Sequence, residues 1–506
     1  MALFAPSLIA LGLSLIIIRL FNVTPWLRLF SLFLTLLFLL LFGFYLLCDF
    51  FTGKGIDDSV AFHLYIGLSG IDLTNFSKLI MISALYLVAV IFVTFFVFFW
   101  KSRAIFLSGG SLFSLFIHIF VPVLLSFSIL ASPAYSDITH LVRDHYKQQG
   151  VSRFEEHVAR FDPKSLSSKK KNLIYIYAES LEFTYFDDER FPGLTPNLGA
   201  LLQHGLVISG IRQAPMTGWT ISGMTASQCG IPLATFGHRN NSRSVMKSFM
   251  PGVHCIGDVL SSGGYELTYM GGADLKFGGK GQFYKDHGFD TRYGTRELED
   301  LADRRLKKSK WGVYDDDLLR LARKKLTTLH ESKKPFGLFL LTLDTHAPLG
   351  HKTPDCIEKG ISYRDSDSQI LNAVSCADYL LGSFIEDFLA SPVHEDTILI
   401  LASDHLVMRN DAGLEANEIE RKNLYVVFDD DLPPRTVARD ASTMDLAATT
   451  LSVMTSSDQG FALGRNLLGT QPTLIEKMGK DKFFESLHAW RKQMWSLWGA
   501  GNTTQE

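Results

Sequence analysis

Residues 397–408 read TILILASDHLVM, and their pattern indicates which fold the chain adopts. Four of the first five residues are apolar and two are β-branched isoleucines, which is typical of a strand buried inside a parallel sheet. The apolar run then stops at Asp404 and His405. An acid and an imidazole directly after a buried strand indicate either a turn with a capping role or a pair of metal ligands.

Two other predicted strands end in residues of the same kind. Residues 172–180, NLIYIYAES, reach Glu179, and residues 335–346, PFGLFLLTLDTH, reach Asp344 and then His346. Ligand sites in parallel sheets lie at the carboxyl ends of the strands. Each residue alone is typical of a loop. Three such strand ends in one domain favour a site for a divalent cation such as Mn²⁺, Mg²⁺ or Zn²⁺.

Strands and helices alternate from residue 172 onward. Apolar, β-rich runs predict six strands, at 172–178, 206–211, 265–272, 335–343, 397–403 and 424–428. Amphipathic or capped segments predict helices between them, at 195–205, 255–264, 315–331, 368–391 and 443–454. This alternation predicts an α/β domain with a mostly parallel central sheet flanked by helices.

A nucleophile is expected in residues 214–233, APMTGWTISGMTASQCGIPL, which are rich in small and hydroxyl side chains. The run after Trp219 is predicted to be helical. A metal-bound hydroxyl at a helix N-terminus would ionise more easily and would lie where an anionic phosphate is stabilised. Thr217, Thr220 and Ser222 all remain candidates from their spacing.

Residues 271–283, GGADLKFGGKGQF, form a glycine-rich loop with Lys276 and Lys280. Such loops can bind phosphate through backbone N–H groups, although surface loops are often rich in glycine and lysine as well. The loop lacks the G-x-x-x-x-G-K-[ST] order of a Walker A motif.

The first 131 residues carry most of the apolar excess of this 506-residue chain, whose mean hydropathy is +0.14. Because a helix needs ~20 apolar residues to cross a bilayer, we expect a four-helix transmembrane region there. The predicted spans are 3–21, 27–47, 79–100 and 112–131. A net charge of −3 gives no sign of a nucleic-acid partner.

Loop charges predict the orientation of these spans. Arg19 and Arg28 flank the first predicted turn, and Lys101 and Arg103 lie in the third. By the positive-inside rule both turns are cytoplasmic, so everything after residue 131 lies outside. The expected division is a transmembrane domain at 1–131, a juxtamembrane linker at 132–171 and an exported catalytic domain at 172–506.

Five cysteines bear on the compartment. Cys48 lies at a predicted membrane boundary, whereas Cys229, Cys255, Cys356 and Cys376 lie in the exported part. An even number in an oxidising compartment suggests two disulfides, but four cysteines allow three connectivities. Their spacing shows no zinc-ribbon pattern.

Several stretches together resemble the alkaline-phosphatase/sulfatase-like superfamily, in its membrane-anchored branch with lipoteichoic acid synthases and phosphoethanolamine transferases. Within that branch the chain is similar to the phosphoglycerol transferases of Gram-negative envelopes. The resemblance covers nearly the whole chain. It is carried by NLIYIYAESLEFTYFD, LTPNLGALLQHGL, TISGMTASQCGIPL, FYKDHGFD, WGVYDDDLL, LFLLTLDTHAP, NAVSC and ILASDHL.

This resemblance implies a role for individual residues. It implies that Thr220 is the nucleophile, that His346 and Lys280 contact the substrate phosphate, and that one divalent metal ion, with Mn²⁺ expected first, is bound. The implied metal ligands are Glu179, Thr220, Asp404 and His405. The resemblance also supports the disulfide pairs 229–255 and 356–376.

The implied reaction transfers phosphoglycerol from phosphatidylglycerol to periplasmic glucans, releasing diacylglycerol, through a phosphoglyceryl-threonine intermediate. The implied location is the inner membrane, with the catalytic domain in the periplasm. A phosphoethanolamine transferase acting on lipid A or glucan is the alternative, and a catalytically silent phospholipid or glucan sensor is a third. Sulfatase activity is not expected, because CGIPL lacks the Ser-Arg of the formylglycine motif.

Overall fold

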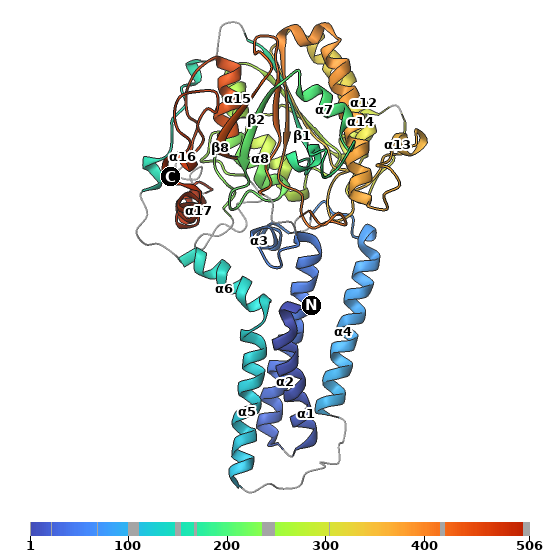
Figure 1. Cartoon of the computed structure of the whole chain (residues 1–506), viewed down its shortest axis with the longest axis vertical. Helices are drawn as coiled ribbons and strands as arrows, with labels where there is room; N and C mark the ends of the chain where they lie inside the picture. The colour runs from blue at the N-terminus through green and yellow to red at the C-terminus, as the bar shows by residue number, and fades with distance from the viewer. Residues whose placement is uncertain are drawn as a thin grey trace. The chain divides into compact units, whose positions relative to one another are not determined.

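The computed structural model describes residues 2–21, 23–67, 69–99, 111–146, 153–165, 170–234, 248–302, 304–414 and 420–498 (Figure 1). These residues belong to two compact units, Met1–Val60 with Asp72–Asp144, and Ala61–Ile71 with His145–Glu506. Lys101 and Arg103, which support the predicted orientation, lie outside the described residues. The predicted domain boundaries and the orientation therefore stay predictions.

The first unit is helical. Its helices are α1 (Ala5–Leu20), α2 (Pro25–Thr52), α4 (Ser77–Phe98), α5 (Ser111–Leu130) and α6 (Pro133–Tyr146), and α3 (Asp58–Ile66) runs from this unit into the second. Three stretches are long and apolar enough to cross a membrane, namely Pro25–Thr52, Leu73–Phe98 and Leu112–Leu130. The structure thus supports three of the four predicted spans. The first, α1, has 16 residues and extends over only ~24 Å, less than the ~30 Å hydrocarbon core of a bilayer.

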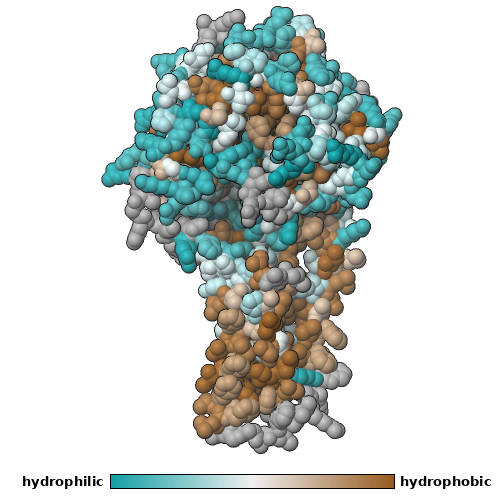
Figure 2. All heavy atoms as spheres, in the orientation of Figure 1, coloured by the Kyte–Doolittle hydropathy of each residue, from teal (hydrophilic) through white to brown (hydrophobic). Residues whose placement is uncertain are grey.

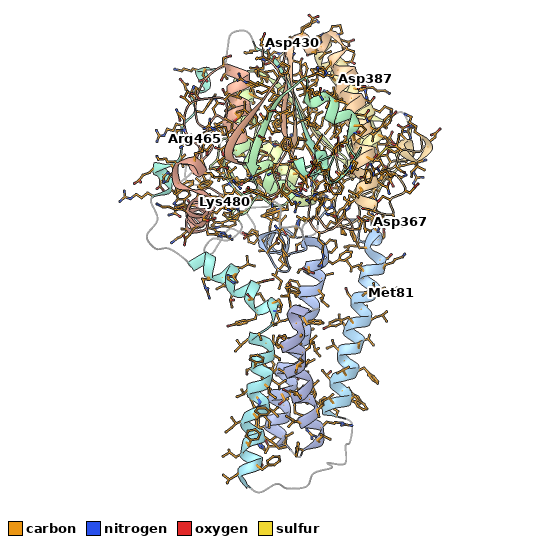
Figure 3. All side chains as sticks on the ribbon, in the orientation of Figure 1. Met81, Asp367, Asp387, Asp430, Arg465 and Lys480 are labelled. Carbon is orange, nitrogen blue, oxygen red and sulfur yellow. A yellow bond between two sulfur atoms is a disulfide. The ribbon has the colours of Figure 1, made fainter. Side chains whose placement is uncertain are left out.

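The surface of these helices is apolar. Figure 2 shows hydrophobic residues covering them, and Figure 3 labels one, Met81 on α4, whose side chain is 57% exposed. Apolar patches of this size are rare on water-exposed surfaces. On the buried faces, some hydroxyls bond back to the preceding helical turn, as Ser14 Oγ does to the Ala10 carbonyl at 2.7 Å. This pattern is typical of helices that face lipid.

The second unit is built on an eight-stranded mixed sheet with the order β4-β3-β5-β1-β6-β7-β2-β8. Only β7 is antiparallel to its neighbours, β6 and β2; the other pairs are parallel. The predicted α/β fold is confirmed, with one reversed strand in a mostly parallel sheet. The strands are β1 (Asn172–Ala178), β2 (Leu206–Arg212), β3 (Glu266–Gly271), β4 (Thr291–Tyr293), β5 (Phe336–Leu341), β6 (Thr397–Ser403), β7 (Tyr425–Phe428) and β8 (Arg435–Ser442).

Helices cover both faces of the sheet, which explains why β1, β5 and β6 are apolar and buried throughout. Alternate residues of β1 enter different cores: Tyr175 and Tyr177 join one cluster, Ile174 and Ile176 the other. The first face is covered by α8 (Thr220–Cys229), α9 (Ile256–Ser262) and α15 (Asp445–Thr455). The second is covered by α7 (Pro196–Leu202), α12 (Asp315–Glu331) and α14 (Gln369–Leu389) (Figure 1).

Two strands were not predicted. β4 has three residues, and β8, RTVARDAS, lies at the sheet edge with its first residues largely exposed, so neither carries the apolar run of a buried strand. The remaining helices are short: α10 (Lys280–Asp286), α11 (Thr295–Leu301), α13 (Pro354–Glu358), α16 (Leu474–Met478), α17 (Lys480–Ala489) and α18 (Arg491–Ser496).

Two disulfides join elements of the second unit. Cys229, the last residue of α8, is bonded to Cys255, which precedes α9. Cys356 in α13 is bonded to Cys376 in α14. These are the two pairs that the resemblance implied, and Cys48 is a free, buried thiol.

Candidate metal and nucleophile site

The carboxyl ends of β1 and β6 bring three candidate ligands together. The strands are parallel neighbours, and Ala178 pairs with Ser403. The next residues along each strand, Glu179 and Asp404, are therefore adjacent, and His405 follows Asp404. One ligand atom from each of these three residues lies within 4.8 Å of the others. Strand register, rather than the loops, thus positions this cluster.

The distances within the cluster are short, and all three side chains are at most 2% exposed. His405 Nε2 lies 3.3 Å from Glu179 Oε1 and 3.3 Å from Asp404 Oδ2. Neighbouring donors orient both carboxylates. Ser180, whose backbone is left-handed with φ 55°, donates its N–H to Asp404 Oδ1 at 2.8 Å and its hydroxyl to Glu179 Oε1 at 2.9 Å.

Two buried atoms of the cluster are unsatisfied. Within the described part of the chain, Asp404 Oδ2 and His405 Nε2 make no hydrogen bond. His405 Nδ1 lies 2.8 Å from the Leu406 carbonyl oxygen, which makes Nδ1 the donor and leaves a lone pair on Nε2 in the neutral ring. A lone pair facing two carboxylate oxygens is repulsive unless a proton or a metal cation lies between them. Two carboxylates and an imidazole therefore fit a divalent cation.

The pKa values of the three side chains also indicate that the cluster is stabilised by positive charge. Burial and the charge of Glu179 raise the pKa of Asp404 to about 7. Burial opposes the charged form of His405, but the charge of Asp404 and the contact with Glu179 raise its pKa to about 9. Burial likewise opposes ionisation of Glu179, whereas His346 and His405 lower its pKa to about 2. The cluster thus favours any bound positive charge, whether a proton or a metal ion.

Among the three candidate hydroxyls, Thr220 reaches this cluster. It is the first residue of α8, and its Oγ1 donates to Glu179 Oε2 at 3.2 Å. Ser222 Oγ instead accepts the Trp219 N–H at 3.0 Å and caps the helix, while Thr217 Oγ1 donates to the Ala214 carbonyl at 2.8 Å. The structure therefore distinguishes side chains that spacing left equivalent.

A glycine allows this close approach. The Gly223 backbone in α8 packs so tightly against Asp404 that a Cβ at this position would overlap the Asp404 carbonyl oxygen. The N-terminal turn of α8 is thus held against the end of β6. A side chain at position 223 would displace Thr220 from the cluster.

Of the two lysines in the glycine-rich loop, Lys280 is buried and Lys276 is exposed. Lys280 begins α10, and its Nζ lies 4.4 Å from the centre of the Phe277 ring. Burial lowers the pKa of Lys280 to about 8, although the charges of Glu179 and Asp404 oppose this. Lys280 is therefore the lysine placed within electrostatic range of the cluster.

The third predicted strand end, at Asp344, supports the fold and does not supply a metal ligand. Asp344, after β5, does not belong to the ligand group. Its Oδ2 accepts the Asp315 N–H at 2.7 Å, and the Asp315 carboxylate accepts the N–H groups of Leu343 and Asp344 at 2.9 and 3.0 Å. These reciprocal bonds hold the start of α12 against the end of β5.

His346 and an aromatic neighbour complete the site. His346 Nδ1 lies 2.6 Å from the Ala347 carbonyl oxygen, and its ring centre lies 4.1 Å from that of Trp311. Burial lowers the pKa of His346, although the charge of Glu179 opposes this. Trp311 and Phe277, which the sequence reasoning did not single out, both adjoin glycines in loops, and only that weak signal could have marked them.

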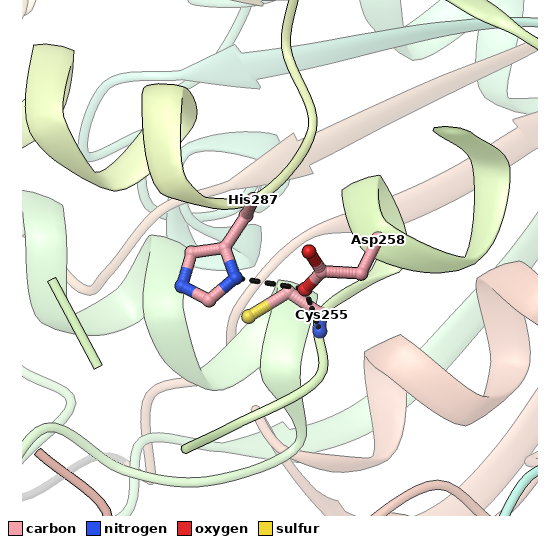
Figure 4. Close-up of side chains that lie close together, drawn as sticks. All are labelled: Cys255, Asp258 and His287. Atoms are coloured by element: carbon pink, nitrogen blue, oxygen red, sulfur yellow. Dashed lines mark hydrogen bonds and ion pairs between the residues drawn. The ribbon is translucent and has the colours of Figure 1, made fainter. Parts of the chain in front are cut away.

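A second group of potential ligands, Cys255, Asp258 and His287, is not available to a metal in this structure (Figure 4). The sulfur of Cys255 is bonded to Cys229. Asp258 Oδ2 accepts the Cys255 N–H at 2.8 Å and lies 2.8 Å from His287 Nδ1. His287 Nε2 lies 3.1 Å from the Phe249 carbonyl oxygen. This group is a satisfied structural cluster.

Comparisons with known proteins show which proteins the chain is similar to. Phosphoglycerol transferase I of Salmonella choleraesuis is 40% identical over 424 residues, which cover 84% of this chain and 54% of that protein. The chain thus spans about half the length of this curated relative. A family model described as "Phosphoglycerol transferase I, N-terminal domain" matches residues 2–150.

Solved structures share the fold of the second unit. A protein of the alkaline phosphatase superfamily from Vibrio parahaemolyticus superposes with a TM-score of 0.50 and 23% identity, covering 69% of this chain and 82% of that one. The lipoteichoic acid synthase LtaP from Listeria monocytogenes superposes with a TM-score of 0.50 and 16% identity, covering 69% of this chain and 97% of that one. The Sulfatase family model matches residues 171–456, more than half of the chain. The chain therefore belongs to the sulfatase family.

Proposed function

We propose that this protein transfers phosphoglycerol from phosphatidylglycerol to periplasmic glucan and releases diacylglycerol. The observation that carries the proposal is the hydrogen bond from Thr220 Oγ1 to Glu179 Oε2, which aims a hydroxyl at the carboxylate–imidazole cluster. Similarity to proteins named phosphoglycerol transferase I supports the choice of the transferred group.

Glu179, Thr220, Asp404 and His405 are the residues that would hold one divalent cation, with Mn²⁺ expected first. When bound, such a cation lowers the pKa of a hydroxyl and offsets developing negative charge. The unsatisfied Asp404 Oδ2 and His405 Nε2 support this assignment.

The side chains then divide the reaction between them. Thr220 Oγ1 loses its proton toward Glu179 Oε2 and attacks phosphorus, forming a P–O bond while the bond to the diacylglycerol oxygen breaks. His346 is placed to hydrogen-bond that leaving oxygen or, in its protonated form, to give it a proton, and Lys280 offsets the phosphate charge. A glucan hydroxyl next attacks phosphorus and passes its proton to His346, while the bond from phosphorus to Thr220 Oγ1 breaks and that oxygen takes its proton back from Glu179. Two steps through a covalent intermediate predict ping-pong kinetics.

The apolar helices suit a lipid donor. We propose that α1 joins the three longer helices in a four-helix region at 1–131 in the inner membrane. Residues 132–171 link it to a periplasmic catalytic domain at 172–506. The two disulfides of the second unit support an oxidising compartment.

The test is diacylglycerol release from labelled phosphatidylglycerol by the full chain, with Mn²⁺ and a β-glucan. Wild type should label the glucan, and Thr220→Ala should not. Thr327→Ala, which changes an exposed threonine on α12, is the matched control. Release without glucan labelling would reject the acceptor only. Turnover of phosphatidylethanolamine alone would reject the donor and favour a phosphoethanolamine transferase, and a fully active Thr220→Ala would refute the mechanism.

A further inference from the structure

Residues Ala61–Ile71 belong to the second unit, although residues on both sides of them belong to the first. Their apolar side chains are part of the core beside α8: Phe62 and Ile66 are 2% and 8% exposed and join the cluster that contains Trp219 and Ile221. The Phe62 ring centre lies 5.8 Å from that of Trp219, the residue before Thr220. This segment is thus part of the core of the second unit.

The same segment packs against the glycine-rich loop. Gly70 has φ +87°, a conformation that disfavours other residues, and a Cβ there would lie 2.7 Å from the Phe277 backbone nitrogen. Phe277 is also the residue whose ring lies 4.4 Å from Lys280 Nζ. The segment therefore reaches the loop that holds the proposed phosphate-binding lysine.

His63 is the polar side chain of this segment that points toward the site. Its ring is nearly parallel to that of Phe277, with an interplanar angle of 14° and centres 5.8 Å apart. The Phe277 ring centre lies 6.2 Å from that of Trp311, which in turn contacts His346. His63, Phe277, Trp311 and His346 thus form a continuous row of rings that also borders Lys280.

His63 Nδ1 is buried and has no hydrogen-bond partner among the residues that the structure describes. Buried polar atoms normally have a partner, so one without it points to a group that is absent from the protein alone. Burial, together with the charge of Lys280, lowers the pKa of His63 to about 4, so the ring is neutral near pH 7. A neutral imidazole offers one donor and one acceptor, which matches a hydroxyl.

We propose that His63 binds a hydroxyl of the glycerol headgroup of the donor lipid and thereby favours phosphatidylglycerol over phosphatidylethanolamine. This inference rests on the proposed function and adds to it the residue that recognises the headgroup of the donor lipid. An ammonium headgroup would meet the positive charge of Lys280 next to His63, whereas a hydroxyl would complete the unsatisfied nitrogen. His63 is a positioning residue and takes no part in proton transfer.

The test compares wild type, His63→Phe and His63→Gln in the full chain, with Leu64→Ala as the control. His63→Phe keeps a ring against Phe277 and removes both nitrogens, whereas His63→Gln keeps a donor and an acceptor. Leu64 is the 69% exposed neighbour. The measurements are KM and kcat for phosphatidylglycerol in mixed micelles, and the inhibition constant of phosphatidylethanolamine as a competitor.

His63→Phe should raise KM for phosphatidylglycerol about tenfold, the loss of about one hydrogen bond, with kcat little changed. The inhibition constant of phosphatidylethanolamine should stay constant, so that discrimination falls about tenfold. His63→Gln should recover most of the loss, and Leu64→Ala should match wild type. A His63→Phe enzyme with unchanged KM, or an equal weakening of both lipids, would overturn the inference while leaving the proposed function intact. No turnover of phosphatidylglycerol by wild type would overturn both.

Discussion

Two clusters of the second unit each bring three potential metal ligands together, and the difference between them shows what makes a reactive site. Glu179, Asp404 and His405 leave Asp404 Oδ2 and His405 Nε2 unsatisfied. In the other cluster, the sulfur of Cys255 is bonded to another sulfur, and Asp258 and His287 satisfy each other. Residue type and proximity alone mark both clusters as candidate metal sites. Unsatisfied atoms separate a candidate metal site from a structural support.

The largest expected effect is on chemistry at the unsatisfied cluster. Glu179→Gln or Asp404→Asn removes a carboxylate charge at nearly constant size. Because a bound metal supplies several kcal/mol of transition-state stabilisation, we expect the transfer rate to fall ~10³-fold or more. Transfer assays and metal analysis of the purified variants measure this. A variant that keeps wild-type rate and metal content would remove the basis of the comparison.

Metal removal should affect stability through the same cluster only. A metal ion at 100 times its Kd stabilises the folded state by ~2.7 kcal/mol, so Mn²⁺ should raise the Tm of chelator-treated wild type. Asp258→Asn should keep this increase, and Asp404→Asn should lose it. An increase in Tm that persists in Asp404→Asn would indicate that Mn²⁺ binds elsewhere.

Lys280 gives a smaller effect that depends on pH. Its ammonium loses a proton as the pH rises through about 8, so activity that needs this charge should fall above that pH. Lys280→Arg keeps its charge, because a guanidinium is not deprotonated in proteins, and the fall above about pH 8 should be absent from its pH profile. Lys280→Ala should lower the rate ~10–100-fold, as expected for one lost charge contact. Identical profiles for wild type and Lys280→Arg would assign the fall to another group.

The smallest effect is expected at the satisfied cluster. Asp258→Asn leaves the Cys255 N–H and His287 less well paired, at a cost of ~1–3 kcal/mol in unfolding free energy. Denaturant titration measures this loss, and kcat per folded molecule should not change. Loss of activity without loss of stability in Asp258→Asn would mean that this cluster, too, serves the reaction.

The sequence pattern was sufficient to predict the strands that position the site. β1 and β6 are uninterrupted apolar runs that pair in parallel, with Ala178 opposite Ser403. The polar residues that follow the two strands therefore lie next to each other. This is why Glu179, Asp404 and His405 could be expected to lie together from strand ends, although the same reasoning also included Asp344. The polar and partly exposed residues of β8 carry no such signal.

Other features depend on contacts between residues far apart in the chain. The Asp344 carboxylate is engaged by Asp315, 29 residues earlier, and spacing cannot reveal that. Thr220 is distinguished from Thr217 and Ser222 by its bond to Glu179, 41 residues away. The sequence also does not predict that Ala61–Ile71 belongs to the second unit, because the helices on both sides of this segment have the composition of membrane spans.

The central claim is that Thr220 carries the transferred group. The most direct measurement is to mix wild type with phosphatidylglycerol labelled in its headgroup, quench before glucan is added, and locate the label by mass spectrometry of the digested protein. The account predicts phosphoglycerol on the peptide with Thr220, its loss when glucan is added, and its absence in Thr220→Ala. Label on another residue, or transfer to glucan by Thr220→Ala at the wild-type rate, would contradict it.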